Sequence, residues 1–187
     1  MKEQVLVDLI KLTGYSDKDR ETLKEFSAQT TGWVDEFVKG FYDTLFAYKP
    51  TSVVFNENER QEREKTLKGW LLTVLNGDVN DDFFRDLWIV GLLHIKRGVP
   101  NSYMLGIMSL VQQLFLKKCL ESFEKADAER LFGAIKRLMD VVAGVIAEGY
   151  YISYVEALYN IAGIKKEVVD RMISIEIDTM IKVERGG

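Results

Sequence analysis

Apolar residues recur at intervals of three and four positions along almost the whole chain, with polar residues between them. This spacing gathers the apolar side chains on one side of an α-helix. Alternating apolar and polar runs bounded by hairpin turns do not occur in the sequence, and neither do internal repeats. The pattern therefore predicts an all-α fold of packed helices with short connections.

Capping and turn residues set the expected ends of these helices. Ser16, with Asp19 three positions later, resembles a capping box, and Asn76-Gly77 is a typical helix end. Asp81 or Asp82 can cap the helix that follows. Helices are thus expected at about 5–12, 17–30, 33–46, 59–75, 81–98, 100–123, 127–163 and 165–183, with a loop around Asn56 and Asn58.

The length of 187 residues fits one domain of ordinary size and leaves no room for a second catalytic domain. We expect the main domain at 1–163 and a C-terminal helix or linker at 164–187. The net charge of -4 is spread along the sequence rather than gathered in a basic face. This distribution argues against nucleic acid as a partner.

Signals for membrane insertion and secretion are not evident in the sequence. The longest apolar stretches are interrupted by Gln112, Gln113 and Asp140, so neither forms a membrane span of roughly 20 residues. The first residues lack the basic and then apolar pattern of a secretion signal. The single Cys119 cannot form an internal disulfide, and we expect a buried, reduced thiol in a cytoplasmic protein.

His94 is the only histidine of the chain. Leu87, Gly91 and His94 stand at positions i, i+4 and i+7, which places them on one helix face. Gly91 has no side chain, so the imidazole is expected beside a gap in which a large flat ligand could lie. A histidine on an apolar face is more often structural, and this pattern alone leaves both interpretations open.

Three kinds of metal site can be compared with these residues. A di-iron bundle needs Glu-x-x-His twice, and one histidine with a glycine three positions before it excludes that class. A zinc site would combine His94 and Cys119 with two carboxylates, an unusual set of ligands. A haem needs one axial imidazole and an apolar slot, and without a Cys-x-x-Cys-His motif it would be bound non-covalently.

Four segments in register resemble the globin-coupled sensors and protoglobins. The segment that ends at Tyr103, GDVNDDFFRDLWIVGLLHIKRGVPNSY, is similar to the family's proximal region, with its acidic opening, histidine, Gly-x-Pro and aromatic residue. Residues 12–26 are similar to the family's opening stretch, VKGFYDTL (38–45) to its Phe-Tyr helix, and KTLKGWLLTVL (65–75) to its distal helix. The resemblance covers nearly all of 5–160. It implies a globin-like fold of the sensor-globin type, with an extra N-terminal helix and long C-terminal helices.

The resemblance also implies a non-covalent site for haem b, with His94 as the proximal ligand of the iron. Tyr42 would reach the distal pocket, and Tyr103 would stand near the proximal histidine. The other expected haem contacts are Phe41, Thr66, Gly69, Trp70 and Gly91. The sixth position of the iron would be open, or occupied by water, by a gas, or by Lys65, Met104 or Met108.

The function that the resemblance implies is binding and sensing of O2, CO or NO, without catalysis. Two alternatives stay open: a standalone protoglobin that handles O2 or detoxifies NO, and a haem-free globin-like signalling adaptor. Family relatives that work without haem have lost the proximal histidine, so His94 favours the haem form. A peroxidase needs a distal acid–base group, and the expected distal residues supply no efficient one.

Family sensors dimerise through their last two long helices and continue into an output domain. We therefore expect a homodimer and a possible output signalling partner. The helix over 127–163 would span roughly 50 Å, more than a small domain needs, which also favours contact with a second subunit. Candidates for the seam between subunits, or for the core of a single chain, are Leu110, Leu114, Met139, Val142, Ile146 and Tyr150.

Overall fold

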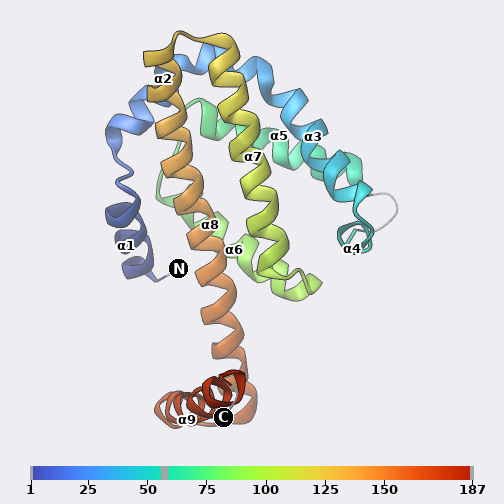
Figure 1. Cartoon of the computed structure of the whole chain (residues 1–187), viewed down its shortest axis with the longest axis vertical. Helices are drawn as coiled ribbons and strands as arrows, with labels where there is room; N and C mark the ends of the chain where they lie inside the picture. Colours follow the sequence, from blue (N-terminus) through green and yellow to red (C-terminus); the bar gives the residue numbers. More distant parts are fainter. Residues whose placement is uncertain (1, 56–58, 186–187) are drawn as a thin grey trace. The chain divides into compact units, whose positions relative to one another are not determined.

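Nine α-helices and one turn of 3-10 helix make up the part of the chain that the computed structural model describes, residues 2–55 and 59–185 (Figure 1). No strand occurs in this part. The helices are α1 (Glu3–Thr13), α2 (Asp17–Thr30), η1 (Thr31–Trp33), α3 (Val34–Ala47), α4 (Lys49–Ser52), α5 (Arg60–Leu75), α6 (Asp81–Arg97), α7 (Asn101–Ser122), α8 (Lys125–Ala162) and α9 (Lys166–Glu184). The all-α prediction is confirmed.

The structure refines the predicted helix ends at two places. Asn80, rather than Asp81 or Asp82, caps α6, because its side chain accepts a hydrogen bond from the Phe83 N–H at 2.9 Å. The two aspartates lie in the first turn, where their charge interacts favourably with the helix dipole. The short α4 was not predicted, although Pro50 in its first turn has the φ that a helix start requires. The predicted loop at Asn56 and Asn58 lies outside the described residues.

The described chain divides into two units, Met1–Tyr150 and Tyr151–Gly187. In the first unit, α8 supplies the largest share of the core. Its inward face recurs every three or four residues and is fully buried at Leu131, Ile135, Leu138, Met139, Val142 and Val145. Phe115 of α7, Leu23 of α2 and Leu75 of α5 are buried in the same unit, each with no exposed surface.

This core corrects the expected seam between subunits. Met139, Val142 and Ile146 are buried within one chain and present no surface to a partner. The apolar pattern that suggested a seam is therefore the pattern of the monomer core. Leu110, Leu114 and Tyr150 are partly exposed.

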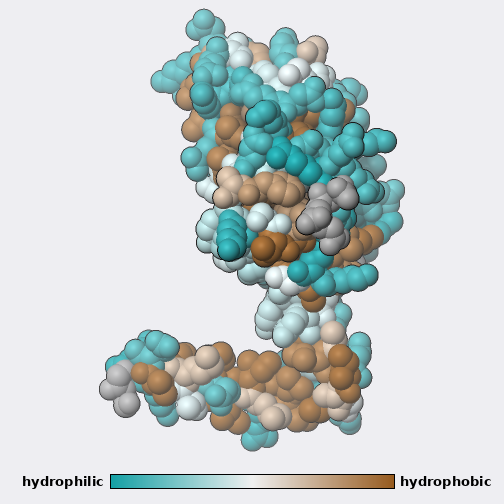
Figure 2. Space-filling view, turned by 90° about the vertical axis from the view of Figure 1, so that its right-hand side faces the viewer, coloured by the Kyte–Doolittle hydropathy of each residue, from teal (hydrophilic) through white to brown (hydrophobic). Residues whose placement is uncertain are grey.

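The second unit, which holds the end of α8 and the whole of α9, has no buried side chain among its described residues. The Tyr159 hydroxyl donates a hydrogen bond to Asp170 at 2.8 Å and so links the two helices. Apolar side chains cover much of this unit in Figure 2. Exposed ones include Tyr151, Leu158, Ile161, Met172, Ile175 and Val183. No described helix is both long and apolar enough to cross a membrane.

One polar contact ties the start of α2 to α8. The Asp19 carboxylate accepts a hydrogen bond from the Ser16 N–H at 2.9 Å, as the predicted capping box requires. The same carboxylate accepts two bonds from Arg137 Nε at 3.2 Å and pairs with its Nη2. The side chain of Asp19 is only 6% exposed, so its charge depends on these partners.

Replacing Asp19 with alanine should therefore destabilise the chain by about 2–3 kcal/mol. This is below the roughly 3–5 kcal/mol of a fully buried pair, because Arg137 keeps partial access to water. Urea unfolding followed by circular dichroism measures the effect. The matched control is Asp17→Ala in the exposed pair with Arg20, which should cost at most about 1 kcal/mol. Equal losses in the two variants would contradict the role of Asp19.

Candidate ligand cavity around His94

A cavity of about 450 Å³ lies in the first unit and is lined by residues from α3, α5, α6, α7 and α8. Its volume falls within the roughly 300–1,000 Å³ typical of small-molecule and cofactor sites. Most of the lining is apolar. It includes Phe37, Leu45, Leu67, Leu71, Leu87, Val90, Ile107, Met108, Val111, Leu114, Val142 and Ile146. A flat apolar ligand would find few polar groups to desolvate here.

His94 lines this cavity from the last turn of α6, and Gly98 with φ 66° caps the C-terminal end of that helix. Its imidazole is partly buried, and its Nδ1 is buried without a hydrogen-bond partner in the described part of the chain. Burial lowers the pKa of His94, and the positive charge of Arg97 lowers it further. The imidazole is therefore neutral near pH 7, and a neutral imidazole is the form that binds metals.

The zinc alternative finds no support in this arrangement. No three His, Cys, Asp or Glu side chains gather as possible metal ligands within the described residues. Cys119 is fully buried and does not line the cavity, and burial raises the pKa of its thiol to about 11. A metal at His94 would thus have one protein ligand, which is the donor set of a haem iron rather than of zinc.

Tyr42 reaches the cavity from α3 and is 5% exposed. Its hydroxyl makes no hydrogen bond to the part of the chain that the structure describes. Burial raises the pKa of Tyr42 to about 12, with a smaller opposing effect of Arg63. The hydroxyl therefore stays protonated and can donate a hydrogen bond to a ligand in the cavity.

Four further predicted site residues also line the cavity: Phe41, Thr66, Trp70 and Tyr103. The ring of Phe41 meets that of Tyr42 edge to face at 5.1 Å. Trp70 stacks on Phe83 at 6.0 Å, and its Nε1 is buried without a partner. The Thr66 hydroxyl donates to the Glu62 carbonyl at 3.0 Å, so its proton is already engaged.

Two predicted site residues, Gly69 and Gly91, do not line the cavity. Gly69 lies on the exposed side of α5, with nothing within 4 Å of a Cβ built on it. The gap expected beside Gly91 is filled by α8, because a Cβ at Gly91 would lie 2.8 Å from the Ile146 carbonyl oxygen. Gly91 thus serves helix packing rather than ligand contact.

Sequence reasoning missed a charged cluster at the cavity. Arg63 of α5 and Arg97 of α6 both line it and share one carboxylate, that of Glu59. Arg97 Nη2 lies 2.6 Å from Glu59 Oε1, and Arg63 Nη2 lies 2.9 Å from the same oxygen. The sequence spacing could have pointed to these arginines. Arg63 precedes Thr66 by three residues and Arg97 follows His94 by three, and residues three apart lie on the same face of a helix.

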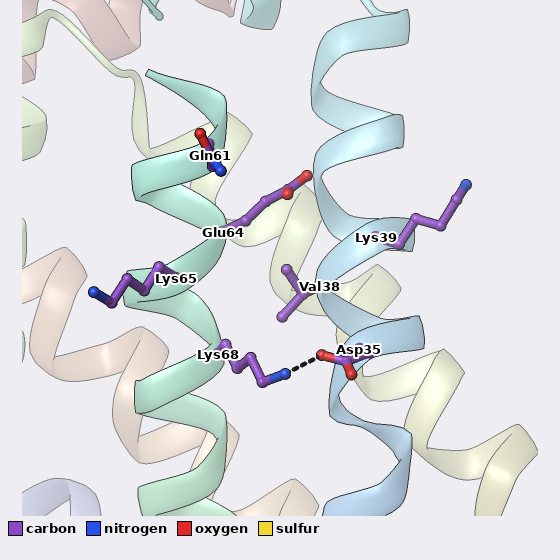
Figure 3. Close-up of a pocket in the computed structure, with 7 residues that line it drawn as sticks. All are labelled: Asp35, Val38, Lys39, Gln61, Glu64, Lys65 and Lys68. Atoms are coloured by element: carbon purple, nitrogen blue, oxygen red, sulfur yellow. Dashed lines mark hydrogen bonds and ion pairs between the residues drawn. The ribbon is translucent and has the colours of Figure 1, made fainter. Parts of the chain in front are cut away.

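A second hollow, of about 430 Å³, lies between α3 and α5 and is mainly polar (Figure 3). Lys68 pairs there with Asp35 at 2.5 Å, while Lys65 points away from that pair. Lys65 lines this hollow and not the cavity around His94. Of the three residues considered as sixth ligands of the iron, Met104 and Met108 line the cavity and Lys65 does not.

The model of one protein family matches residues 2–156, most of the chain. The chain belongs to the protoglobin family. The resemblance found in four sequence segments is thereby confirmed. A globin domain of this family implies haem-based gas binding.

Two solved structures that resemble this protoglobin are globin domains. The globin domain of the Geobacter sulfurreducens globin-coupled sensor matches with a TM-score of 0.71 and 19% identity, over 76% of this chain and 95% of that domain. The ferric globin domain of E. coli DosC matches with a TM-score of 0.63 and 13% identity, over 78% and 99%. These likenesses confirm the sensor-globin fold.

A curated relative of this protoglobin is an uncharacterized protein of Methanocaldococcus jannaschii, 22% identical over 99 residues. The match covers 51% of this chain and 52% of the relative, about half the length of each.

The lowered pKa of His94 predicts a pH dependence of stability for the haem-free protein. The folded pKa lies below the unfolded value of about 6.5, so the unfolded chain takes up a proton first as the pH falls. The contribution of the neutral imidazole to the free energy of unfolding is fully present above about pH 6.5 and is lost as the pH falls below this value. Urea unfolding at about pH 7.5 and pH 5.5 should therefore show a larger acid loss for the natural chain than for His94→Leu. Equal losses would mean that His94 is not desolvated.

Proposed function

We propose that this protoglobin binds haem b non-covalently in the 450 Å³ cavity, with His94 as the proximal ligand, and that it binds and senses a diatomic gas. One observation carries the proposal. The only histidine of the chain and a buried tyrosine with an uncommitted hydroxyl reach the same mainly apolar cavity from different helices. A haem supplies an iron whose free coordination position binds O2, CO or NO.

The residues of the cavity fit a haem in three respects. The neutral imidazole of His94 offers a lone pair, and its unpartnered Nδ1 shows that no protein group occupies that nitrogen. The apolar side chains exclude water from the ring. Arg63 and Arg97 line the cavity, and their guanidinium groups are well suited to bind the two carboxylates that a haem carries.

The polar groups of the cavity favour gas binding over catalysis. The Tyr42 hydroxyl can donate to a ligand whose outer atom carries partial negative charge, but a pKa of about 12 makes it a poor proton shuttle. The proton of Thr66 is engaged by Glu62. This supports a binding protein rather than a peroxidase.

A sensor also needs a partner that responds to the ligand state. The second unit supports this part of the proposal, because it buries no side chain of its own among its described residues and exposes many apolar ones. A unit of this size needs a disulfide, a metal or a partner to be stable, and its sequence contains no cysteine. A homodimer contact at this unit fits these features, as does an output domain.

His94→Gly should abolish stoichiometric haem binding and leave the helical circular dichroism signal intact. Added imidazole should restore binding, because it replaces the missing ligand in the cavity. The measurement is the absorption spectrum of the ferrous protein before and after CO, with a sharp shift expected for the natural chain. Tyr15→Phe, which changes a buried tyrosine outside the cavity, is the control. Full haem retention by His94→Gly without imidazole would overturn the ligand assignment.

Tyr42→Phe should speed O2 dissociation about 5- to 30-fold, since it removes a hydrogen bond worth about 1–2 kcal/mol. Stopped-flow displacement of O2 by CO measures the rate. Thr66→Val is the matched control, because its hydroxyl already bonds to Glu62 and its loss should leave the rate nearly unchanged. If Thr66→Val alone accelerates dissociation, the donor has been assigned to the wrong helix.

A further inference from the structure

The backbones of α6 and α8 touch at a pair of glycines. A Cβ built on Gly91 would lie 2.8 Å from the carbonyl oxygen of Ile146 and 3.1 Å from the amide nitrogen of Tyr150. A Cβ built on Gly149 would lie 3.2 Å from the ring of Trp88 and 3.4 Å from the Trp88 carbonyl oxygen. Gly91 thus lets the backbone of α8 approach α6 more closely than any side chain would allow, and a Cβ at Gly149 would press on the Trp88 ring.

Among the glycines inside the described helices, only Gly91 and Gly149 would place a Cβ within 3.4 Å of the backbone of a neighbouring helix. Gly69 and Gly106 lie within helices too, yet a Cβ on either would meet nothing within 4 Å. At Gly144 the obstacle is the flexible side chain of Leu9, which can rotate away. Helical glycine lowers helix stability relative to alanine, so a glycine that a neighbouring backbone requires has a packing role.

The crossing adjoins the candidate iron ligand. Leu87, Gly91 and His94 share one face of α6, and the two outer residues line the cavity. Gly91, the middle residue, faces the backbone of α8 instead of the cavity. Ile146 belongs to both features, because its carbonyl oxygen faces Gly91 while the residue itself lines the cavity.

We propose that Gly91 and Gly149 are positioning residues: their crossing fixes where His94 stands in the cavity and makes α8 move with α6 when a gas binds. The inference rests on the proposed haem function of His94. A contact between two backbones has no side-chain torsion that could absorb a displacement, and packed elements shift together rather than deform. A shift of α6 at His94 is therefore passed to α8 one turn away.

The first test compares Gly91→Ala and Gly149→Ala with Gly106→Ala, an alanine at an open helical glycine. Resonance Raman spectra of the ferrous, gas-free protein report the iron–histidine stretching band, which a general loss of stability does not move. Both crossing variants should shift this band and lose haem faster, by about tenfold or more, because the added methyl group forces α6 and its histidine away from α8. The control should keep the natural band and rate.

Gly149→Ala meets longer contacts than Gly91→Ala, so it decides the test if the latter does not fold. If Gly149→Ala binds haem with the natural band and the natural rate of haem loss, the positioning role is overturned. If the natural chain itself binds no haem, the proposed function fails instead, and the two failures are thus distinct.

A second measurement uses the natural chain alone. Amide hydrogen exchange, compared with and without CO, should change at residues 142–150 of α8 and stay constant in α2, none of whose residues lines the cavity. Unchanged exchange in 142–150 on CO binding would overturn the coupling between α6 and α8.

Discussion

Burial of the apolar face of α8 is the constraint on which the first unit depends. The inward-facing side chains of this helix between Leu131 and Val145 are fully buried, and side chains of α2, α3, α5, α6 and α7 contribute to the same core. The α6 helix joins this core by backbone contact at Gly91. Because α8 also forms one wall of the cavity through Val142 and Ile146, the core and the candidate site share one element. Changes in either should therefore be felt in the other.

Much of this arrangement could be predicted from local sequence patterns. The three- and four-residue spacing of apolar positions gave the helices, because each amphipathic face must be buried against another. Tyr42, Trp70 and His94 were assigned to one site by resemblance to a family, and the structure brings them to one cavity. Prediction from the sequence succeeded for features that depend on residues within one helix or one short segment.

The features that could not be predicted depend on contacts between helices. Periodicity identifies an apolar face but not what covers it, so Met139 was a candidate for both a seam between subunits and the core, and it lies in the core. Gly91 suggested open space, yet the absence of a side chain serves equally to admit a neighbouring backbone, as α8 does here. Lys65 and Thr66 are adjacent in sequence, but a rotation of about 100° per residue sends them to different hollows.

The burial of Cys119 bears on how a protein proposed to bind a diatomic gas would withstand oxidation. A haem exposed to O2 releases reactive oxygen species, and thiolates are the protein groups that these attack most readily. The only cysteine of the chain is fully buried, and burial raises its pKa to about 11, so almost no thiolate forms at neutral pH. The chain therefore carries no accessible thiol that could be oxidised to a sulfenic acid or joined to another molecule through a disulfide. Oxidation would fall instead on methionines, of which Met172 and Met180 are exposed, and methionine sulfoxide is an injury that cellular reductases repair.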